Sequence, residues 1–310
     1  MKKFLLLILF LVMPAELAAE EGNAMSSLPY FKQGAGARSA GMGNTGTALA
    51  MDATAAYWNP AGLAVFSPYR ILTYAMYYRS SLDRKSGYIS IAENLFGQGL
   101  GISWNYFGIS GIEGRNDAGD FTGGLESQSH CIGISYGRRL WQEVLAGATA
   151  KYFRCILAGS KAYGFGFDAG MLYQQAEFNL GLNIQDINTG ICWDTGRKDE
   201  VMPTLRLGTA YQVIYETITS AFDIEMTLHK RTRCHFGLEC RVVEFCCLRG
   251  GWDGNFTAGI GFEVKNYCLD YAFTFDRYGV GNFHRIGLRA DFGNSDKQKN
   301  GSKETDNTGE

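Results

Sequence analysis

Three scarcities limit what this 310-residue chain can be. The formal net charge is only −2, so the basic excess that marks nucleic-acid-binding proteins is absent and we expect no nucleic-acid partner. No run of about 18 apolar residues follows the N-terminal leader, so we expect no transmembrane helix. There are only five prolines against forty glycines, seventeen tyrosines and twenty phenylalanines. This balance indicates many strands rich in aromatic residues.

The leader itself has the pattern of a signal peptide. Lys2 and Lys3 form a basic start, residues 4–13 are apolar, and Leu17-Ala18-Ala19 is a plausible cleavage site. We therefore predict a cleaved signal peptide over residues 1–19 and an exported protein. No cysteine follows the cleavage site closely, so a lipoprotein anchor is not expected.

From Pro68 onward the chain alternates apolar and polar residues in about fourteen segments of roughly 9 to 14 residues each. Segments 178–185, 222–229, 267–276 and 283–292 alternate most regularly. Strands of soluble proteins are usually about five or six residues long, whereas a tilted strand that crosses a bilayer needs about 9 to 11. The pattern therefore predicts an all-β fold, a transmembrane antiparallel β-barrel over residues 68–292 with about 14 strands.

The breaks between these segments are mostly short. The longest, residues 110–127 and 186–202, contain glycine and aspartate and are expected to be extracellular loops. Residues 293–310 are polar and rich in glycine, asparagine and lysine, and we predict a disordered tail there.

Alternation also assigns charged residues to one face of the wall. An arginine that faces lipid near the middle of the bilayer costs roughly 2 to 4 kcal/mol. The charged residues expected to face the lumen instead are Asp168, Arg206, Asp223, Glu225, Asp270, Arg285 and Arg289. We expect Asp223 and Glu225, which share a face, to pair with Arg206 or Arg289 rather than to act in acid–base catalysis.

Eight cysteines are unusual for an outer-membrane barrel. Their spacing is not that of a small disulfide-stapled scaffold, and most fall within predicted strands. We expect mainly free thiols, with Cys234 and Cys240 facing lipid and Cys268 facing the lumen. One or two cross-strand disulfides are the alternative.

Three short patterns look like chemistry but have the wrong surroundings. The G-x-G-x-x-G of residues 41–46 lacks a preceding strand, and Asp52 comes too early for a dinucleotide site. The G-x-S-x-G of residues 133–137 falls within a strand rather than at a strand-to-helix turn. Cys234 and His235 point to opposite faces and lack the spacing of a zinc site. We therefore expect no catalytic residue, no metal, no cofactor and no enzyme activity.

The segment 34–63 is rich in glycine and alanine and ends in Trp58-Asn59-Pro60-Ala61-Gly62-Leu63. Such small residues bury little area alone but suit a segment enclosed by something else. Pro60 is well placed at the first position of a short helical turn capped by Asn59. Trp58 and Leu63 would then fix that turn to the wall.

This segment resembles the N-terminal part of the PorV/PorQ family, a branch of the FadL-like outer-membrane barrels. The resemblance is looser in the strands, for example in Pro203-Thr204-Leu205-Arg206-Leu207-Gly208. It implies that residues 20–67 form a hatch that plugs the lumen. The hatch motif that carries it comprises Arg38, Gly41, Gly43, Asp52, Trp58, Asn59, Pro60 and Gly62.

The resemblance implies two alternative functions at the outer membrane. The first is a channel for hydrophobic or amphipathic small molecules, surrounded by outer-membrane lipid. The second is a non-enzymatic role in a type IX-like secretion or surface-attachment system, with secretion-system proteins as partners. Whether Trp58-Asn59-Pro60 only wedges the hatch or also gates a path beside it is left open.

Overall fold

The structure is a computed structural model that describes residues 29–66, 70–80, 84–228, 230–275 and 282–293. The predicted signal peptide lies outside the described residues, as does the predicted tail apart from residue 293. Within the described ranges, no helix has both the length and the apolar character needed to cross a membrane.

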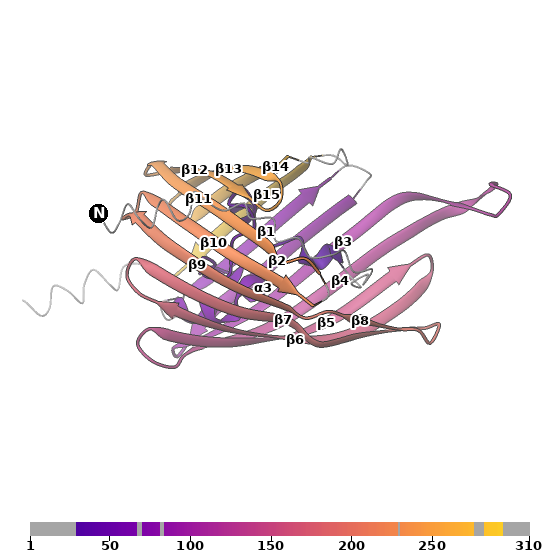
Figure 1. Cartoon of the computed structure of the whole chain (residues 1–310), viewed down its shortest axis with the longest axis horizontal. Coiled ribbons are helices and arrows are strands. Elements are labelled where there is room, and N and C mark those ends of the chain that lie inside the picture. Colours follow the sequence, from indigo (N-terminus) through magenta and orange to yellow (C-terminus); the bar gives the residue numbers. More distant parts are fainter. Residues whose placement is uncertain (1–28, 67–69, 81–83, 229, 276–281, 294–310) are drawn as a thin grey trace, which may run out of the picture.

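A closed antiparallel β-barrel forms the body of the molecule, and its strands are strongly tilted (Figure 1). Fifteen strands are hydrogen-bonded in one sheet, and the β6–β7 pairing closes it. The short strand β8 pairs only with β7, so fourteen strands make the wall of the described chain. The strands are β1 (Ile71–Arg79), β2 (Arg84–Leu95), β3 (Gln98–Arg115), β4 (Phe121–Arg139), β5 (Val144–Leu157), β6 (Ser160–Gln174), β7 (Phe178–Trp193), β8 (Lys198–Val201), β9 (Thr204–Ile214), β10 (Ile218–Thr227), β11 (Arg233–Val243), β12 (Cys246–Trp252), β13 (Phe256–Val264), β14 (Tyr267–Thr274) and β15 (Phe283–Phe292).

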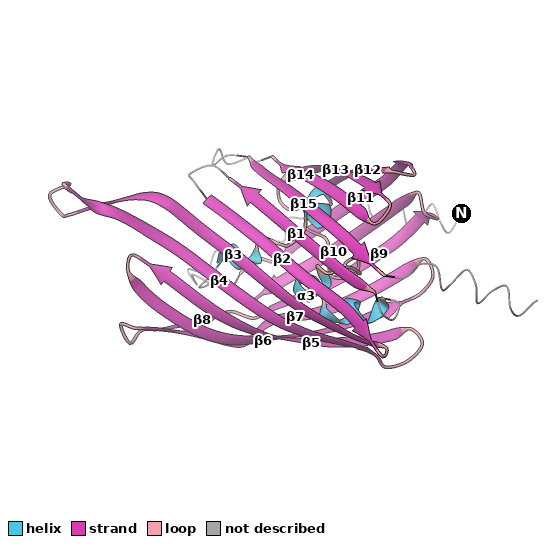
Figure 2. Cartoon of the chain, turned by 180° about the vertical axis from the view of Figure 1, so that it is seen from behind, coloured by secondary structure: helices cyan, strands magenta, loops and turns pink. Residues whose placement is uncertain are grey.

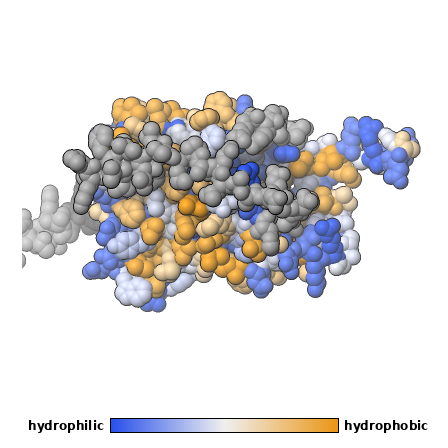
Figure 3. Space-filling model, in the orientation of Figure 1, coloured by the Kyte–Doolittle hydropathy of each residue, from blue (hydrophilic) through white to orange (hydrophobic). Residues whose placement is uncertain are grey.

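The period-two pattern explains which way side chains point. Large apolar residues such as Ile134 and Phe165 stand exposed on the outer surface, at 64% and 65%. Their polar or small neighbours along the strand are buried inside. Figure 3 shows hydrophobic side chains over the middle of the barrel and hydrophilic ones towards the tip of the β3–β4 hairpin. This surface is that of a protein embedded in lipid.

The two ends of the barrel differ. At one end, here called the turn end, strands are joined by short turns such as Phe96–Gly97. The other end, here called the loop end, carries the β3–β4 hairpin, which extends far beyond the neighbouring strands (Figure 1). Short turns are typical of the periplasmic side of such barrels.

The predicted loops 110–127 and 186–202 are largely strand, which corrects the expectation from the sequence. β3 and β4 continue to pair up to Arg115 and Phe121, with register shifts on the way. β7 continues to Trp193 because β8 supplies a new partner for its outer half. Glycine and aspartate weaken strands but did not end these, because each extension is one hairpin whose backbone groups satisfy one another.

Inside the barrel lies the N-terminal segment, residues 31–66, here called the plug segment (Figure 2). The short helix η1 (Pro29–Lys32) leads into it, and its other elements are α2 (Ala37–Gly41), α3 (Ala55–Trp58) and η2 (Pro60–Val65). The predicted turn is η2: Pro60 is its first residue, and the Asn59 side chain accepts a hydrogen bond from the Ala61 amide at 3.2 Å. Most plug residues are buried, because glycine and alanine leave room for the wall to approach.

Candidate functional site

The plug segment sits on a row of glycines on the inner wall. Gly99, Gly137, Gly147 and Gly170 lie directly opposite one another on β3, β4, β5 and β6. A Cβ on any of them would lie closer than 3.0 Å to an atom of residues 59–63. This glycine row is therefore the surface that η2 needs in order to pack against the wall.

Asn59 ties this corner of the plug together. Besides capping η2, its side-chain amide donates to the carbonyls of Thr47 and of Met171 on β6, each at 2.9 Å. Pro60 packs against Gly137 and Gly147, so Asn59 and Pro60, the two residues that begin the predicted turn, both contact the wall.

Trp58 is fully buried between the rest of the plug segment and the wall. Its indole N–H donates to the Ala35 carbonyl at 2.6 Å, and its own carbonyl accepts from Asn183 at 2.7 Å. The Arg206 guanidinium lies 5.0 Å from the ring centroid. This geometry is that of a cation–π contact.

The glycines of the hatch motif are positions of close approach. Gly43 has φ 69°, and a Cβ there would collide with backbone of β11 and β12. Gly41 lies against Gly259, and a Cβ on Gly62 would collide with the Ala50 carbonyl. A Cβ on Gly46 would likewise collide with the Trp58 ring. The G-x-G-x-x-G thus serves packing, and the helix α2 before it replaces the strand that a dinucleotide site requires.

Arg38 anchors α2 to the wall through a charge network. Its guanidinium donates to both oxygens of Glu239 on β11, at 2.9 and 2.6 Å. Arg249 joins the same carboxylate at 2.6 Å and also donates to Asp270 at 2.7 Å. Burial alone would lower the pKa of Arg38, but the nearby carboxylates of Glu239, Asp52 and Asp270 together raise it, so the guanidinium stays charged.

Asp223 of β10 holds the next part of the plug. One of its carboxylate oxygens accepts from the backbone amides of Gly46 and Thr47, both at 3.0 Å, and from the Thr47 hydroxyl at 2.7 Å. Asp223 is 1% exposed. Its expected pairing with Arg206 or Arg289 is not what the structure has, since Asp223 binds the plug instead.

Glu225 pairs with Arg206, in line with the pattern of the sequence. Glu225 also lies 3.7 Å from Arg233 and 3.6 Å from the His235 ring. Arg206 is 2% exposed, and its Nε and Nη1 have no hydrogen-bond partner among the described residues.

The remaining predicted lumenal charges also face the plug. Arg285 donates to the Asn44 side chain at 3.0 Å and to the Gln33 carbonyl at 2.9 Å. Arg289 lies 3.9 Å from Asp52 and 3.3 Å from Glu263. Asp52 in turn accepts from the Thr54 amide at 2.8 Å, at the start of α3.

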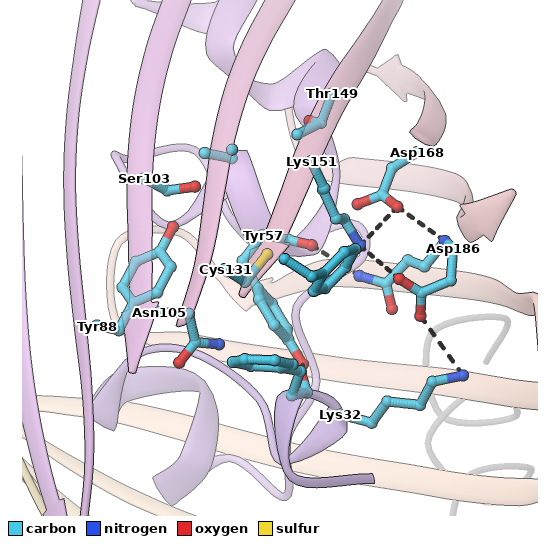
Figure 4. Close-up of a pocket in the computed structure, with 15 residues that line it drawn as sticks. Lys32, Tyr57, Tyr88, Ser103, Asn105, Cys131, Thr149, Lys151, Asp168 and Asp186 are labelled. Carbon is cyan, nitrogen blue, oxygen red and sulfur yellow. Dashed lines mark hydrogen bonds and ion pairs between the residues drawn. The ribbon is translucent and has the colours of Figure 1, made fainter. Parts of the chain in front are cut away.

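A small cavity of about 40 Å³ separates the plug from β2–β7. Lys151 projects into it and pairs with Asp168 at 2.7 Å and with Asp186 at 2.8 Å, while Lys32 of the plug approaches Asp186 at 3.5 Å (Figure 4). Burial lowers the pKa of Lys32, against the raising effect of Asp186. A cavity of this size has room for a few water molecules.

Asp186 reaches this cluster because β7 bulges there. Two register shifts against β6 flank Ile187, and Asp186 and Asn188 have φ of 62° and 49°. Bulges re-aim side chains. Here Gln185 and Asp186 are both buried, although strict alternation would turn one of them outward.

A larger vestibule of about 260 Å³ opens on the loop-end side of the plug. Glu225 and Asp253 are its acids, and six basic side chains line it: Lys32, Arg206, Lys230, Arg231, Arg233 and Arg285. The vestibule is therefore strongly cationic. Lys32 lines both the vestibule and the small cavity, so it stands between them.

The other motifs have structural places. Ser135 of the G-x-S-x-G lies within β4 and shares a hydrogen bond with Thr149 at 2.8 Å. His235 is buried with Nδ1 2.9 Å from the Gly43 carbonyl, while Cys234 is exposed. In the described ranges no His/Cys/Asp/Glu group is arranged to hold a metal. All eight cysteines are free thiols.

Sequence reasoning missed several charged residues of this site, among them Glu239, Arg249, Lys151 and Asp186. Glu239 was within reach, because the outward assignment of Cys234 and Cys240 puts it inside. Arg249 and Lys151 also alternate inward, but their segments have weaker patterns. Asp186 had no signal, since a bulge sets its direction.

Comparisons with known proteins agree with this architecture. The family model described as type IX secretion system protein PorV matches residues 17–230. No curated protein matches the chain.

Solved structures match by fold. The Pseudomonas putida toluene transporter TodX superposes with a TM-score of 0.62 at 13% identity, covering 83% of this chain and 96% of its own. The Ralstonia pickettii toluene transporter TbuX gives 0.60 at 14%, covering 83% and 97%. A Pseudomonas aeruginosa FadL homologue gives 0.55 at 11%, covering 82% and 97%.

Proposed function

This chain belongs to the PorV family of type IX secretion system proteins, and from that premise we propose that it is an outer-membrane passage for amphipathic small molecules. Residues 20–67 act as its hatch and residues 68–292 as its barrel. The toluene transporters that share the fold carry hydrophobic cargo, and the fold likeness supports the same kind of task here.

The observation that carries the proposal is the pair of spaces on either side of Lys32. The cationic vestibule faces the loop end, and the small cavity lies deeper, beside the plug. Because the vestibule is lined by charge, a molecule with one polar end fits it better than a pure hydrocarbon. Passage then requires the plug to shift, since the cavity of about 40 Å³ is too small for such a molecule.

Gentle purification and mass spectrometry of co-extracted small molecules test this function. We expect an amphipathic molecule in the wild type and less of it in Arg285→Gln, which removes a cation from the vestibule. Arg70→Gln is the matched control, because Arg70 pairs with Asp291 at the turn end, away from the vestibule. No bound molecule, together with unchanged uptake in a deletion strain, contradicts the proposal.

The second candidate is a non-enzymatic component of the secretion machinery itself. The family match favours it, and the β3–β4 hairpin offers a surface that reaches beyond the barrel rim (Figure 1). Asn116 stabilises the tip of the hairpin, because its side chain accepts hydrogen bonds from the Ala118 and Asp120 amides at 3.0 and 2.8 Å.

Deleting residues 112–125 shortens this hairpin and leaves the wall intact, since these residues pair only with one another. If the secretion role is correct, the shortened protein recovers fewer secretion partners in a pull-down while small-molecule retention is unchanged. Recovery of no such partner by the full chain contradicts this candidate.

A further inference from the structure

One outer face of the barrel carries a cation where lipid is expected. Arg154 of β5 points outward and is exposed, with His130 and Tyr163 directly opposite it on β4 and β6. Within the described part of the chain no acid pairs with Arg154. An unpaired arginine on this surface is costly near the middle of a bilayer, so its depth matters.

The register of β3–β6 gives that depth. Arg154 lies three residues before the end of β5 at Leu157, close to the loop end. Its own cross-strand row contains Tyr106, His130, Arg154 and Tyr163. The next row towards the turn end contains Trp104, Ile132, Tyr152 and Phe165, and the one after it Ile102, Ile134, Ala150 and Phe167.

Polarity thus changes in order along the wall. An apolar row is followed by a mainly aromatic row, then by the row with His130 and Arg154, and then by one with Gln128 and Lys161. Aromatic girdles mark the level of lipid head groups. Arg154 therefore stands at the head-group level of the loop-end leaflet.

The surface there is hollowed rather than flat. A groove of about 430 Å³ is lined by Trp104, His130, Ile132, Tyr152, Arg154 and Tyr163. The Trp104 indole N–H donates to His130 Nδ1 at 3.3 Å, and the two rings are stacked. Since Nδ1 accepts, the neutral ring carries its proton on Nε2, which is a second donor beside the guanidinium.

We propose that this groove binds a membrane lipid whose phosphate sits on Arg154. Arginine matches phosphate with two parallel hydrogen bonds, and His130 adds a third donor. The acyl chains follow the apolar rows below, over Ile132 and Ile134. This site lies on the outside of the barrel, so it does not depend on the passage proposed for the lumen.

Native mass spectrometry of the full chain in mild detergent tests the site. We expect the wild type to retain a phosphate-bearing lipid and Arg154→Gln to retain at least about tenfold less, because one charged hydrogen-bonding group is lost. Arg138→Gln is the matched control: Arg138 is also exposed on β4 but lies near the turn end. Arg154→Lys keeps the charge without the fork and should retain an intermediate amount.

A phosphate-free detergent identifies the source of the phosphate. In dodecyl maltoside, added phosphatidic acid or lipid A should raise the unfolding temperature of the wild type but not of Arg154→Gln, and inorganic phosphate should not raise it in either protein. Three results would each overturn the proposal. They are equal lipid retention by the wild type and Arg154→Gln, an equal loss of lipid in Arg138→Gln, and a co-purifying protein that Arg154→Gln loses while its bound lipid is unchanged.

Discussion

At the scale of single residues, charged side chains of the wall act mainly as anchors for the plug. Arg38 is held by Glu239, and Asp223 holds Gly46 and Thr47. The sequence predicted that Asp223 faces inward, because it alternates with Phe222 and Ile224. It did not predict the partner, because the choice between a charged side chain and a backbone amide depends on where the plug turns.

Asp223→Asn is expected to loosen the plug around Thr47. The amide oxygen of Asn can take the place of the one carboxylate oxygen that accepts all three hydrogen bonds, but it is neutral. The three bonds therefore lose their charge assistance, at about 1 to 3 kcal/mol in all. Hydrogen exchange should rise at residues 44–50. Asp291→Asn, on the exposed Arg70 pair, should leave these residues protected; equal exchange in both variants contradicts the anchor role.

Tyr57 gives the plug a dependence on alkaline pH. Burial raises the pKa of Tyr57 to about 12 from its ordinary value of 10.0, against the lowering effect of Arg206. Between these two pH values the folded protein keeps a proton that the unfolded chain has lost, so the free energy of unfolding falls as pH rises. Denaturant titrations at pH 10 and pH 12 should show this loss.

Tyr57→Phe removes the titrating group and should show a smaller loss over the same pH range. The variant is less stable at neutral pH, because the hydroxyl accepts from the Gly34 amide and donates to the Phe31 carbonyl. The comparison is therefore between slopes against pH and not between absolute stabilities. Equal slopes would show that Tyr57 keeps its ordinary pKa.

At the scale of elements, alternation predicted the strands well and their contacts poorly. The facing of 178–185 and 267–275 follows from the period of two, since one face must be apolar to meet lipid. The bulge around Asp186 and the long β3–β4 hairpin could not be predicted from the alternation of apolar and polar residues. The glycine row was visible only as glycine in strands, because its partner is far away in sequence.

Two adjacent glycines of β12 allow the effect of a clash with the plug on stability to be distinguished from the effect of strand propensity. A Cβ on Gly251 would collide with Met42 and Gly43 of the plug, whereas one on Gly250 would meet nothing closer than 4.0 Å. Gly251→Ala should destabilise the protein by about 1 to 3 kcal/mol, as expected for overpacking. Gly250→Ala should be close to neutral in the same thermal unfolding measurement, and similar losses would locate the effect in the strand.

At the scale of the whole molecule, plug and wall form one buried unit that closes the lumen. Anchors come from both sides: Arg38 binds β11, Asn59 binds β6, and Asp223 of β10 binds the plug. The fold was predictable because alternation and small plug residues are both local in the sequence. The closure was not, because it results from contacts between residues such as Arg38 and Glu239 that are two hundred positions apart.

Ion conductance in planar bilayers measures this closure directly. We expect almost no conductance from the wild type, because the plug fills the lumen apart from spaces of about 40 and 260 Å³ that face it. The double variant Arg38→Gln/Asp223→Asn removes two anchors and should conduct in bursts, as the plug shifts and returns. Arg70→Gln, which breaks the ion pair with Asp291 at the turn end rather than an anchor of the plug, should stay closed. A wild type that conducts like an empty barrel, or a double variant as silent as the wild type, would show that these anchors do not hold the passage shut.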